Sequence, residues 1–533
     1  MKKYTNNILI ILISFFAISI TPVEFQNDTY YTIKIGETIS EKGIDFKDNF
    51  SWHDNLIYTY PHWLYDYITY IVYDNFSLTG IYIMTVILSI TLGISLYLVS
   101  ANLSRSKVVA FFLTILTLIG MSKFIAARAQ LITFILFIWQ VFSIEKYLET
   151  KQKRYIALLI IIPLLIANLH SAVFYMVYIL YLPYIAEYLV TKIIKSNFFI
   201  NKRINKLKKL SNKKENKKAC LEKISYLKKK KKQLKKTMSN PHKIQLEENK
   251  NTLNLIIIMI ISFFTGLLTP LKLEPYTHLI KLMIGTTTEY IQEHQPTIFA
   301  ENMTSLIPVL IFIIILIFTK VKIKLRDLFM FTGLTILMIT SSRQTSLLLI
   351  IGINIIAKLI VDIIPKEKLY QIEKDFNKKT IISLTIIIYI GISLLFLTFQ
   401  VDKKFISKEK YPIKAADYIL NNLDIENIKI YNEYSHGSYL LYRGIPVFID
   451  SRADLYSKEF NRLNNDIFKD SFEIYSLKTN YDNKFSMYNI THILVSRGKD
   501  LNTMIKSNQL KNKEYKIIYE DTNHILYERL SKY

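Results

Sequence analysis

The chain has a single cysteine, Cys220, so no disulfide within the chain can stabilise any part of it. Glycine and proline are also scarce, with 13 and 12 copies in 533 residues, although 51% of the residues are hydrophobic. Long apolar runs therefore continue with few interruptions, and Ile, Leu, Phe and Tyr supply most of their bulk. A soluble protein of this length would not need so many uninterrupted runs, whereas membrane-spanning helices do.

Roughly eleven apolar stretches lie between residues 7 and 400. The first follows Met1-Lys2-Lys3 and lacks a small-x-small cleavage site, so we expect a retained helix at about 5–23 rather than a removed signal peptide. Lys and Arg concentrate in the connections that would then be cytoplasmic: 104–107, 146–154, 192–250, 320–326 and 366–379. The other connections would face outward: 24–60, 121–130, 168–170, 272–302 and 341–344. The sequence predicts a polytopic α-helical membrane protein of about eleven transmembrane helices, with a cytoplasmic N-terminus.

The formal net charge of +25 is concentrated in one of these connections. Residues 201–250 hold 19 Lys or Arg against four Glu, and the Lys228 to Lys232 run is followed by the breaker segment Ser239-Asn240-Pro241. We interpret 193–252 as a cytoplasmic basic insert, a charged helical hairpin that touches the anionic headgroups of membrane lipids. Aromatic residues are almost missing from it, and this argues against nucleic acid as a partner.

The last 130 residues change from long apolar runs to short alternating ones. We expect strands at 428–431, 446–449, 492–495, 515–520 and 524–528, and helices at about 413–423, 458–469 and 501–507. Gly437 is interpreted as a tight turn, because one glycine makes no phosphate loop. The sequence thus predicts a C-terminal extracytoplasmic α/β domain at 401–533, large enough to bury its own core, after a multispanning membrane domain at 1–400.

With this topology, nearly every charged or His residue that looks buried falls on the outer side. A charge at membrane depth is costly unless it is paired or hydrated, so this one-sidedness predicts an outward-facing site. The outer loop 24–66 holds carboxylates that could act as a general base or bind a divalent cation: Asp45, Asp48 and Asp54. It also holds His53 and His62, the latter at the start of an aromatic helix expected to lie along the membrane interface.

Three outer turns and one outer loop carry side chains suited to holding a lipid phosphate. They are Lys123, Arg128 and Gln130 in the first turn, Asn168 and His170 in the second, Arg343 in the third, and His278 in the loop 272–302. Each of these alone is more often a packing or interfacial residue. Together they predict a phosphate site at the outer leaflet.

Asp450, Arg452 and Asp454 alternate after a predicted strand. They could form an ion-pair network that only fixes the loop. Alternatively, they could meet a ligand at the carboxyl edge of the sheet.

The acidic first loop, the turn Ala127-Arg128-Ala129-Gln130, the turn Asn168-Leu169-His170 and the exterior C-terminal domain resemble the integral-membrane glycosyltransferases of the C-type superfamily. More narrowly, Tyr434-Ser435-His436-Gly437-Ser438-Tyr439-Leu440 and the later Val447-Phe448-Ile449-Asp450-Ser451-Arg452-Ala453-Asp454-Leu455-Tyr456 resemble a bacterial branch of that superfamily. The resemblance covers most of the chain except the basic insert.

The resemblance implies transfer of a sugar from a polyprenyl-phosphate-linked donor to an envelope glycan, lipid or protein outside the cytoplasm, in the manner of the mannosyltransferases. A phosphate leaves without help from an acid, so the reaction needs a base for the incoming nucleophile and stabilisation of the departing phosphate. The family's first-loop carboxylate maps onto Asp54, Asp48 or Asp45, in that order, because this sequence lacks a plain Asp-Glu pair there.

Two other functional classes are compatible with the sequence. A transporter or flippase of a lipid-linked or anionic substrate would place polar groups near the bilayer midplane and often contains repeats, whereas these spans have few central charges and no convincing repeat. A non-catalytic scaffold for envelope assembly is the third class, if the acidic loop is merely solvated.

Overall fold

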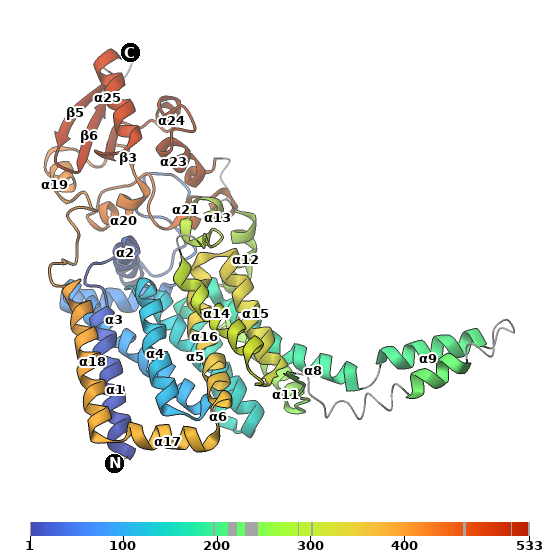
Figure 1. Cartoon of the computed structure of the whole chain (residues 1–533). Helices are drawn as coiled ribbons and strands as arrows, with labels where there is room; N and C mark the ends of the chain where they lie inside the picture. The colour runs from blue at the N-terminus through green and yellow to red at the C-terminus, as the bar shows by residue number, and fades with distance from the viewer. Residues whose placement is uncertain are drawn as a thin grey trace.

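The computed structural model describes residues 2–195, 198–211, 221–229, 243–285, 287–299, 302–461, 465–512 and 514–530. Figure 1 shows an upright bundle of helices with a smaller α/β region packed on one end, where the C-terminus lies. The N-terminus lies at the opposite end, which α17 (Lys366–Phe376) crosses. A helical arm leaves the side of the bundle through α8 (Leu182–Lys195) and continues into α9 (Phe198–Ser211).

Six described helical segments are long and apolar enough to cross a membrane. They are Trp63–Ser104, Lys107–Phe124, Ala129–Thr150, Ser171–Ile194, Ser342–Ile363 and Lys379–Thr398. Shorter apolar helices accompany them at Thr5–Ile20, Asn251–Leu267 and Met303–Phe318. The protein is therefore a multi-pass helical membrane protein with about six candidate spans and a C-terminal mixed α/β region.

The bundle helices end where charged or small polar residues interrupt the apolar runs. The helices are α1 (Lys2–Ile20), α3 (Trp63–Ser104), α4 (Lys107–Met121), α5 (Ala129–Thr150), α6 (Lys153–Leu169), α7 (Phe174–Ile179), α8, α11 (Asn251–Phe263), α14 (Met303–Phe318), α15 (Leu325–Thr340), α16 (Thr345–Ile363) and α18 (Lys379–Thr398). Between α3 and α4, for example, Arg105 adopts a left-handed φ of 64° and the Ser106 hydroxyl caps α4. A helix begins after Pro61, as expected, because α3 consists of two helices that meet at a kink at Ser77 (φ 54°).

Buried charges also gather at the end of the bundle away from the α/β region. Arg326 contacts Glu145 at 3.4 Å and Glu187 at 3.1 Å, and Lys358 contacts Asp327 at 3.3 Å. The expectation that nearly every buried charge lies at the other end is therefore wrong. These charges are tolerated because each pairs with an opposite charge from another helix.

The basic insert returns to the bundle through β1 (Ile244–Gln245), which pairs in parallel with β2 (Ile323–Lys324). The described part of the insert includes α9 and a helix at 221–229. Ile204 and Ile224 are buried, whereas the described Lys and Arg side chains on both helices are exposed. Cys220, residues 230–232 of the Lys run and the predicted break at 239–241 lie outside the described residues.

A four-stranded sheet forms the centre of the C-terminal region, in the order β3-β4-β6-β5. The strands are β3 (Ile430–Asn432), β4 (His492–Ser496), β5 (Tyr515–Glu520) and β6 (His524–Arg529), with β3 and β4 parallel and the other pairs antiparallel. The helices are α19 (Ile413–Asn422), α20 (Tyr434–Tyr442), α21 (Ala453–Tyr456), α22 (Lys458–Asn461), α23 (Ile467–Tyr475), α24 (Tyr481–Met487) and α25 (Asp500–Asn512). Four of the five predicted strands are confirmed, as are the helices predicted at 413–423 and 501–507.

Three local predictions in this region are wrong. The segment 446–449 is not a strand, because Val447 makes only an isolated bridge to Ser51 of the first loop. The helix predicted at 458–469 is divided into α22 and the start of α23. Gly437 lies inside α20 rather than in a turn, and an added Cβ would come within 1.9 Å of the Ile449 carbonyl oxygen. The glycine therefore serves close packing of the helix against this segment.

The first loop and the C-terminal region share one hydrophobic core. The loop begins with α2 (Asn27–Lys42), from which the buried Tyr30 ring packs at 5.0 Å from Tyr411 and 5.5 Å from Tyr439. Trp52 Nε1 donates to the carbonyl of Ile430, 3.0 Å away. Residues 24–60 thus form a layer between the bundle and the sheet, as the position of α2 in Figure 1 shows.

Candidate active site

The turn between α4 and α5 places Arg128 against a carboxylate of α2. Its guanidinium lies 2.5 Å from Asp28 Oδ2, 3.5 Å from Glu293 Oε1 and 3.5 Å from the amide oxygen of Gln26. Burial alone would lower the pKa of Arg128, but the negative charges of Asp28 and Glu293 outweigh it and raise this pKa. The cation at this position is therefore held charged by two carboxylates.

A second guanidinium, that of Arg343, reaches the same place from the turn between α15 and α16. Its Nη1 lies 3.3 Å from Nε2 of His294. Burial, followed by the charge of Arg343, lowers the pKa of His294 to about 4, so the ring is neutral and its Nε2 accepts this hydrogen bond. Burial would raise the pKa of Glu293, but Arg128 and then Arg343 outweigh it and lower that pKa. Two cations from separate hairpins therefore face one carboxylate, whose side chain is 53% exposed.

The short turn after α6 brings His170 to the edge of this cluster. Its Nδ1 lies 2.9 Å from Thr133 Oγ1, and its ring meets that of His62 edge-on at 5.2 Å. Burial lowers the pKa of His170 well below its usual value, and the charges of His62, Arg343 and Arg128 lower it further. His62 in turn lies 3.8 Å from the fully buried carboxylate of Asp66.

The other predicted phosphate-binding residues of these turns lie apart or are already bonded. Asn168 accepts a hydrogen bond from Trp63 Nε1 at 3.2 Å and donates to the Leu268 carbonyl at 3.1 Å, so its amide joins two segments of the protein. Lys123 is exposed and donates to Asn302 Oδ1 at 3.0 Å. Gln130 is half-buried on α5.

The three predicted first-loop carboxylates have different surroundings. Asp54 is exposed. Asp45 is also exposed and accepts a hydrogen bond from the Tyr60 hydroxyl at 2.7 Å; burial would raise its pKa, but hydrogen bonds from Lys47 N–H and Tyr60 lower it. Asp48 is buried and lies 2.7 Å from Arg452 Nη1.

Asp450 and Arg452 form a buried network rather than an open site. Arg452 donates to both oxygens of Asp450, at 2.9 and 2.7 Å, and Tyr456 donates to the same carboxylate at 2.5 Å. Through Asp48, this network joins the first loop to the C-terminal region. The geometry matches the ion-pair interpretation of the motif, with Asp48 in the place expected for Asp454.

Asp454 instead meets the bundle. Its carboxylate lies 3.3 Å from Nε2 of His278 on α12 (Glu274–Ile284), and Nδ1 of the same ring lies 3.1 Å from Glu274. His53 packs between Trp52 and Phe448, and its Nε2 lies 2.8 Å from the Phe448 carbonyl. Both histidines therefore sit at contacts between the C-terminal region and its neighbours.

A divalent cation would need several oxygen or nitrogen ligands at one point. Within the described ranges, no group of three or more His, Cys, Asp or Glu side chains is arranged to hold a metal ion.

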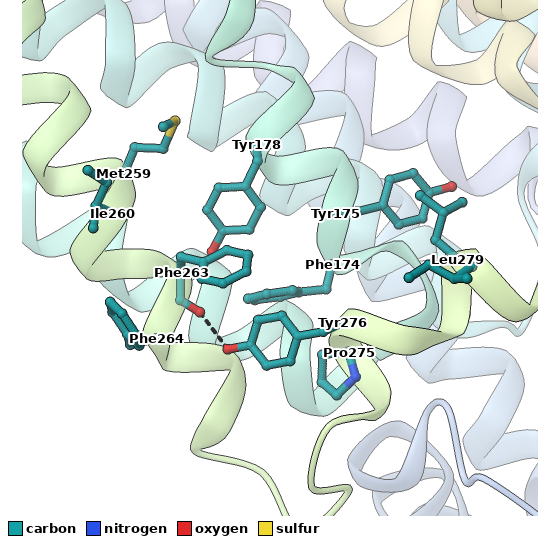
Figure 2. Close-up of a pocket in the computed structure, with 11 residues that line it drawn as sticks. Phe174, Tyr175, Tyr178, Met259, Ile260, Phe263, Phe264, Pro275, Tyr276 and Leu279 are labelled. Atoms are coloured by element: carbon teal, nitrogen blue, oxygen red, sulfur yellow. Dashed lines mark hydrogen bonds between the residues drawn. The ribbon is translucent and has the colours of Figure 1, made fainter.

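An apolar groove opens on the side of the bundle between α7, α11 and α12. It encloses about 440 Å³, and Figure 2 shows its aromatic walls, with Phe174 facing Tyr276 and Phe263. The Tyr276 hydroxyl donates to the Phe263 carbonyl at 2.7 Å, which fixes one wall of the groove. The groove begins four residues after His170 and includes Tyr175, which interacts electrostatically with Arg343. One lining residue of the groove, Tyr175, thus lies within electrostatic range of Arg343.

Comparisons with known proteins show which solved structures share the fold of this chain. No protein-family model matches the sequence, and no curated protein is detectably similar to it. Among solved structures, oligosaccharyltransferase AglB of Archaeoglobus fulgidus, in complex with an inhibitory peptide and a dolichol-phosphate, superposes with a TM-score of 0.56 over 93% of this chain and 70% of that one, at 10% identity. The chain has the oligosaccharyltransferase fold.

Two further structures of the Archaeoglobus fulgidus enzyme agree. The apo form gives a TM-score of 0.55 at 11% identity, covering 93% of this chain and 70% of that one. The form tethered to an acceptor peptide with an NVT sequon gives a TM-score of 0.54 at 12% identity, covering 99% of this chain and 74% of that one. All three superpositions show that the chain shares its fold with this archaeal enzyme.

The predicted site did not include four residues that the fold brings close to it: Asp28, Asp66, Glu293 and His294. Asp28 precedes the acidic stretch that drew attention to the first loop, and one signal could have found it. It lies in the first turn of a helix directly after span one, where a carboxylate is favoured by the free N–H groups of the helix end. The pairing with Arg128, 100 residues later, has no local signal.

Proposed function

We propose that the protein is a membrane glycosyltransferase that moves a sugar from a polyprenyl-phosphate-linked donor to an envelope acceptor on the extracytoplasmic side. The single observation that carries this proposal is the pair of guanidiniums, Arg128 and Arg343, that face one carboxylate beside an apolar groove. Planar guanidiniums suit the oxygens of a phosphate group. The shared fold with an oligosaccharyltransferase supports the same class of reaction.

The topology of this proposal has eleven spans: the six longer helical segments, the three shorter apolar helices, and the helices α6 and α15. The N-terminus and the insert 193–252 would be cytoplasmic, and residues 401–533 would form an extracytoplasmic domain over the site. Lys and Arg in the connections away from the α/β end support this orientation. Membrane lipids would surround the spans, and the groove between α7 and α12 would take the isoprenoid chain of the donor.

In the reaction, an acceptor hydroxyl attacks the anomeric carbon of the sugar. The new C–O bond forms as the bond between that carbon and the phosphate oxygen breaks, and the carrier leaves as a polyprenyl phosphate. Arg128 and Arg343 would stabilise the negative charge that develops on the phosphate. The phosphate would take the place of Glu293, whose side chain is more exposed than that of Asp28. The proton of the acceptor would pass to a carboxylate, and no acid is needed on the leaving side.

We propose Asp28 as that carboxylate, ahead of the first-loop candidates Asp54, Asp48 and Asp45. Asp28 lies in contact with Arg128, so it stands where phosphate and acceptor would meet. Asp48 and its arginine are each only 1% exposed, whereas Asp28 is 16% exposed and Arg128 22%, so a substrate could reach Asp28 but not Asp48. Asp45 is hydrogen-bonded to a tyrosine. Asp54 is exposed on the loop, and it remains the alternative base.

The test uses the purified full-length protein with a polyprenyl-phosphate-linked radioactive sugar and an envelope extract as acceptor source. Asp28→Asn should lower turnover by about 10²–10⁴-fold, and Arg128→Gln should weaken donor binding. Asp54→Asn tests the alternative base and should retain turnover, and Asp74→Asn, at an exposed carboxylate of α3, is the matched control. Wild-type turnover in Asp28→Asn would refute the assigned base. Movement of the donor across proteoliposomes without a glycosidic product would instead favour a transporter.

A further inference from the structure

A polar cavity lies at the end of the bundle away from the α/β region, opposite the turns that hold Arg128 and Arg343. It encloses about 530 Å³ and is lined by the ends of α3, α5 and α16, the starts of α15 and α17, and the segments around β1 and β2. Seven basic side chains line it against five acidic ones: Arg105, Lys146, Lys322, Lys324, Arg326, Lys358 and Lys366, against Glu145, Glu149, Glu247, Asp327 and Asp362. A concave site of this size with an excess of positive charge suits a small anionic group.

The buried charges of this cavity are paired with one another. Arg326, whose side chain is 6% exposed, contacts Glu145 at 3.4 Å and Glu187 at 3.1 Å. Lys358 lies 3.2 Å from Glu145 and 3.3 Å from Asp327. These contacts join α5, α8, α15 and α16, and removing one partner of such a buried network is strongly destabilising. We therefore expect these residues to be a fixed part of the cavity wall.

Glu247 is a more exposed carboxylate that stands where the oxygen of a bound anion would lie. Its Oε2 atom lies 3.0 Å from Lys324 Nζ and 3.2 Å from Arg326 Nη1, and its side chain is 43% exposed. One oxygen thus contacts an ammonium and a guanidinium, the two groups that proteins use to hold a phosphate. Two further cations, Lys322 and Lys366, are exposed at the cavity and form no ion pair with a described residue. Their charges are available to a ligand.

The surroundings of the cavity favour a lipid over a soluble anion. One wall belongs to α17, which lies across the end of the bundle (Figure 1) and exposes Tyr370 by 68% and Ile372 by 41%. A short helix with both lysines and exposed apolar side chains is typical of the headgroup level of a bilayer. Leu103, Leu148 and Leu369 also line the cavity beside its charges. An apolar wall next to cations matches a phosphate that is attached to a glycerol and acyl chains.

We propose that this cavity binds the phosphate of an anionic phospholipid from the leaflet at this end of the bundle. The phosphate takes the place of the Glu247 carboxylate beside Lys324 and Arg326. Lys322 and Lys366 add the charges that favour an anionic headgroup over a zwitterionic one. Glu247 belongs to the segment through which the basic insert returns to the bundle, so lipid binding and the position of that segment are linked. This inference does not depend on sugar transfer.

The experiment titrates the delipidated full-length protein, in detergent, with dioleoylphosphatidylglycerol or dioleoylphosphatidylcholine and measures bound lipid by native mass spectrometry. The wild-type protein should prefer phosphatidylglycerol. Lys322→Gln combined with Lys366→Gln should weaken phosphatidylglycerol binding about thirtyfold, because each basic residue near a headgroup contributes about fivefold, and should leave phosphatidylcholine binding unchanged. Glu247→Gln should strengthen phosphatidylglycerol binding about fivefold, because the charge that competes for Lys324 and Arg326 is removed.

The matched control is Lys320→Gln combined with Lys368→Gln. These two lysines are exposed, lie two residues from Lys322 and Lys366, and do not line the cavity, so this variant has the same net charge and should bind like wild type. Equal weakening in both double variants would overturn the inference, because it would show a general effect of surface charge. Equal wild-type affinity for the two lipids would also overturn it. Inorganic phosphate should not displace phosphatidylglycerol, and complete displacement would replace the lipid by a soluble anion as the ligand.

Discussion

Replacing Arg452 by methionine would leave two buried carboxylates without their shared cation. The side chains of Asp48 and Asp450 are 1% and 0% exposed, and both lie 2.7 Å from the guanidinium. Removing one partner of a buried ion pair costs about 3–5 kcal/mol. Each carboxylate keeps another donor, the Ser51 N–H at 2.9 Å and the Tyr456 hydroxyl at 2.5 Å, so we expect the lower figure, about 3 kcal/mol.

The loss should be visible as faster proteolysis of the C-terminal region in the full-length protein. When opening is fast relative to cleavage, the cleavage rate follows the population of the open form, so about 3 kcal/mol corresponds to roughly a hundredfold increase. The control is Arg443→Met, whose pairing with Asp417 at 2.8 Å is partly exposed and should contribute less than about 1 kcal/mol. Adding Asp48→Asn to Arg452→Met should recover part of the loss. Equal cleavage rates for the Arg452 and Arg443 variants would refute the reasoning.

Three further perturbations test other parts of the structure. Gly36→Ala places a Cβ 2.2 Å from the Asp66 carbonyl oxygen, so thermal melting should show a loss of stability as α2 is forced off α3. Gly437→Ala should destabilise the C-terminal region more than a usual surface change does, because its Cβ would lie 1.9 Å from the Ile449 oxygen; proteolysis should detect this. Burial, and then neighbouring positive charges, lowers the pKa of His436 from 6.5 to about 3, so only the unfolded chain binds this proton between those values. Stability should therefore be full above about pH 6.5 and fall with acidification, and His436→Gln should reduce that fall in pH-dependent melting.

Matched glycine variants separate steric conflict from a general helix effect. Gly333 and Gly391 lie in helices, and an added Cβ at either would meet nothing within 4 Å. Gly333→Ala and Gly391→Ala should therefore be neutral or slightly stabilising. A loss of stability in these variants equal to that of Gly36→Ala would contradict the packing explanation.

The bundle was largely predictable because its signals are local. A charged residue in the hydrocarbon layer is so unfavourable that Arg105 and Lys107 must lie near the ends of α3 and α4, whatever the rest of the chain does. Alternating apolar residues likewise predicted β5 with its observed bounds, Tyr515–Glu520. Both inferences needed only neighbouring residues.

The errors arose where distant segments decide the structure. The run 446–449 has the composition of a strand, but its backbone meets Ser51 of the first loop instead of the sheet. In the sequence, Asp28 looks like any carboxylate in the first turn of a helix, and only the fold shows its contact with Arg128. Glu187 lies inside an apolar helix and Arg326 in a basic connection, and nothing local in the sequence indicates that these residues, 139 positions apart, form a buried pair.

The shared core of the first loop and the C-terminal region also has a consequence for biogenesis. Trp52 and Ile430, which bond to each other, are separated by 378 residues. At about 5–20 residues per second, the ribosome needs roughly 20–75 s to make the second after the first. During that interval Trp52 lacks its partner in the C-terminal region. The C-terminal region is therefore the last part of the molecule to mature, because the core that it shares with the first loop closes only after Ile430 and the residues beyond it have been made.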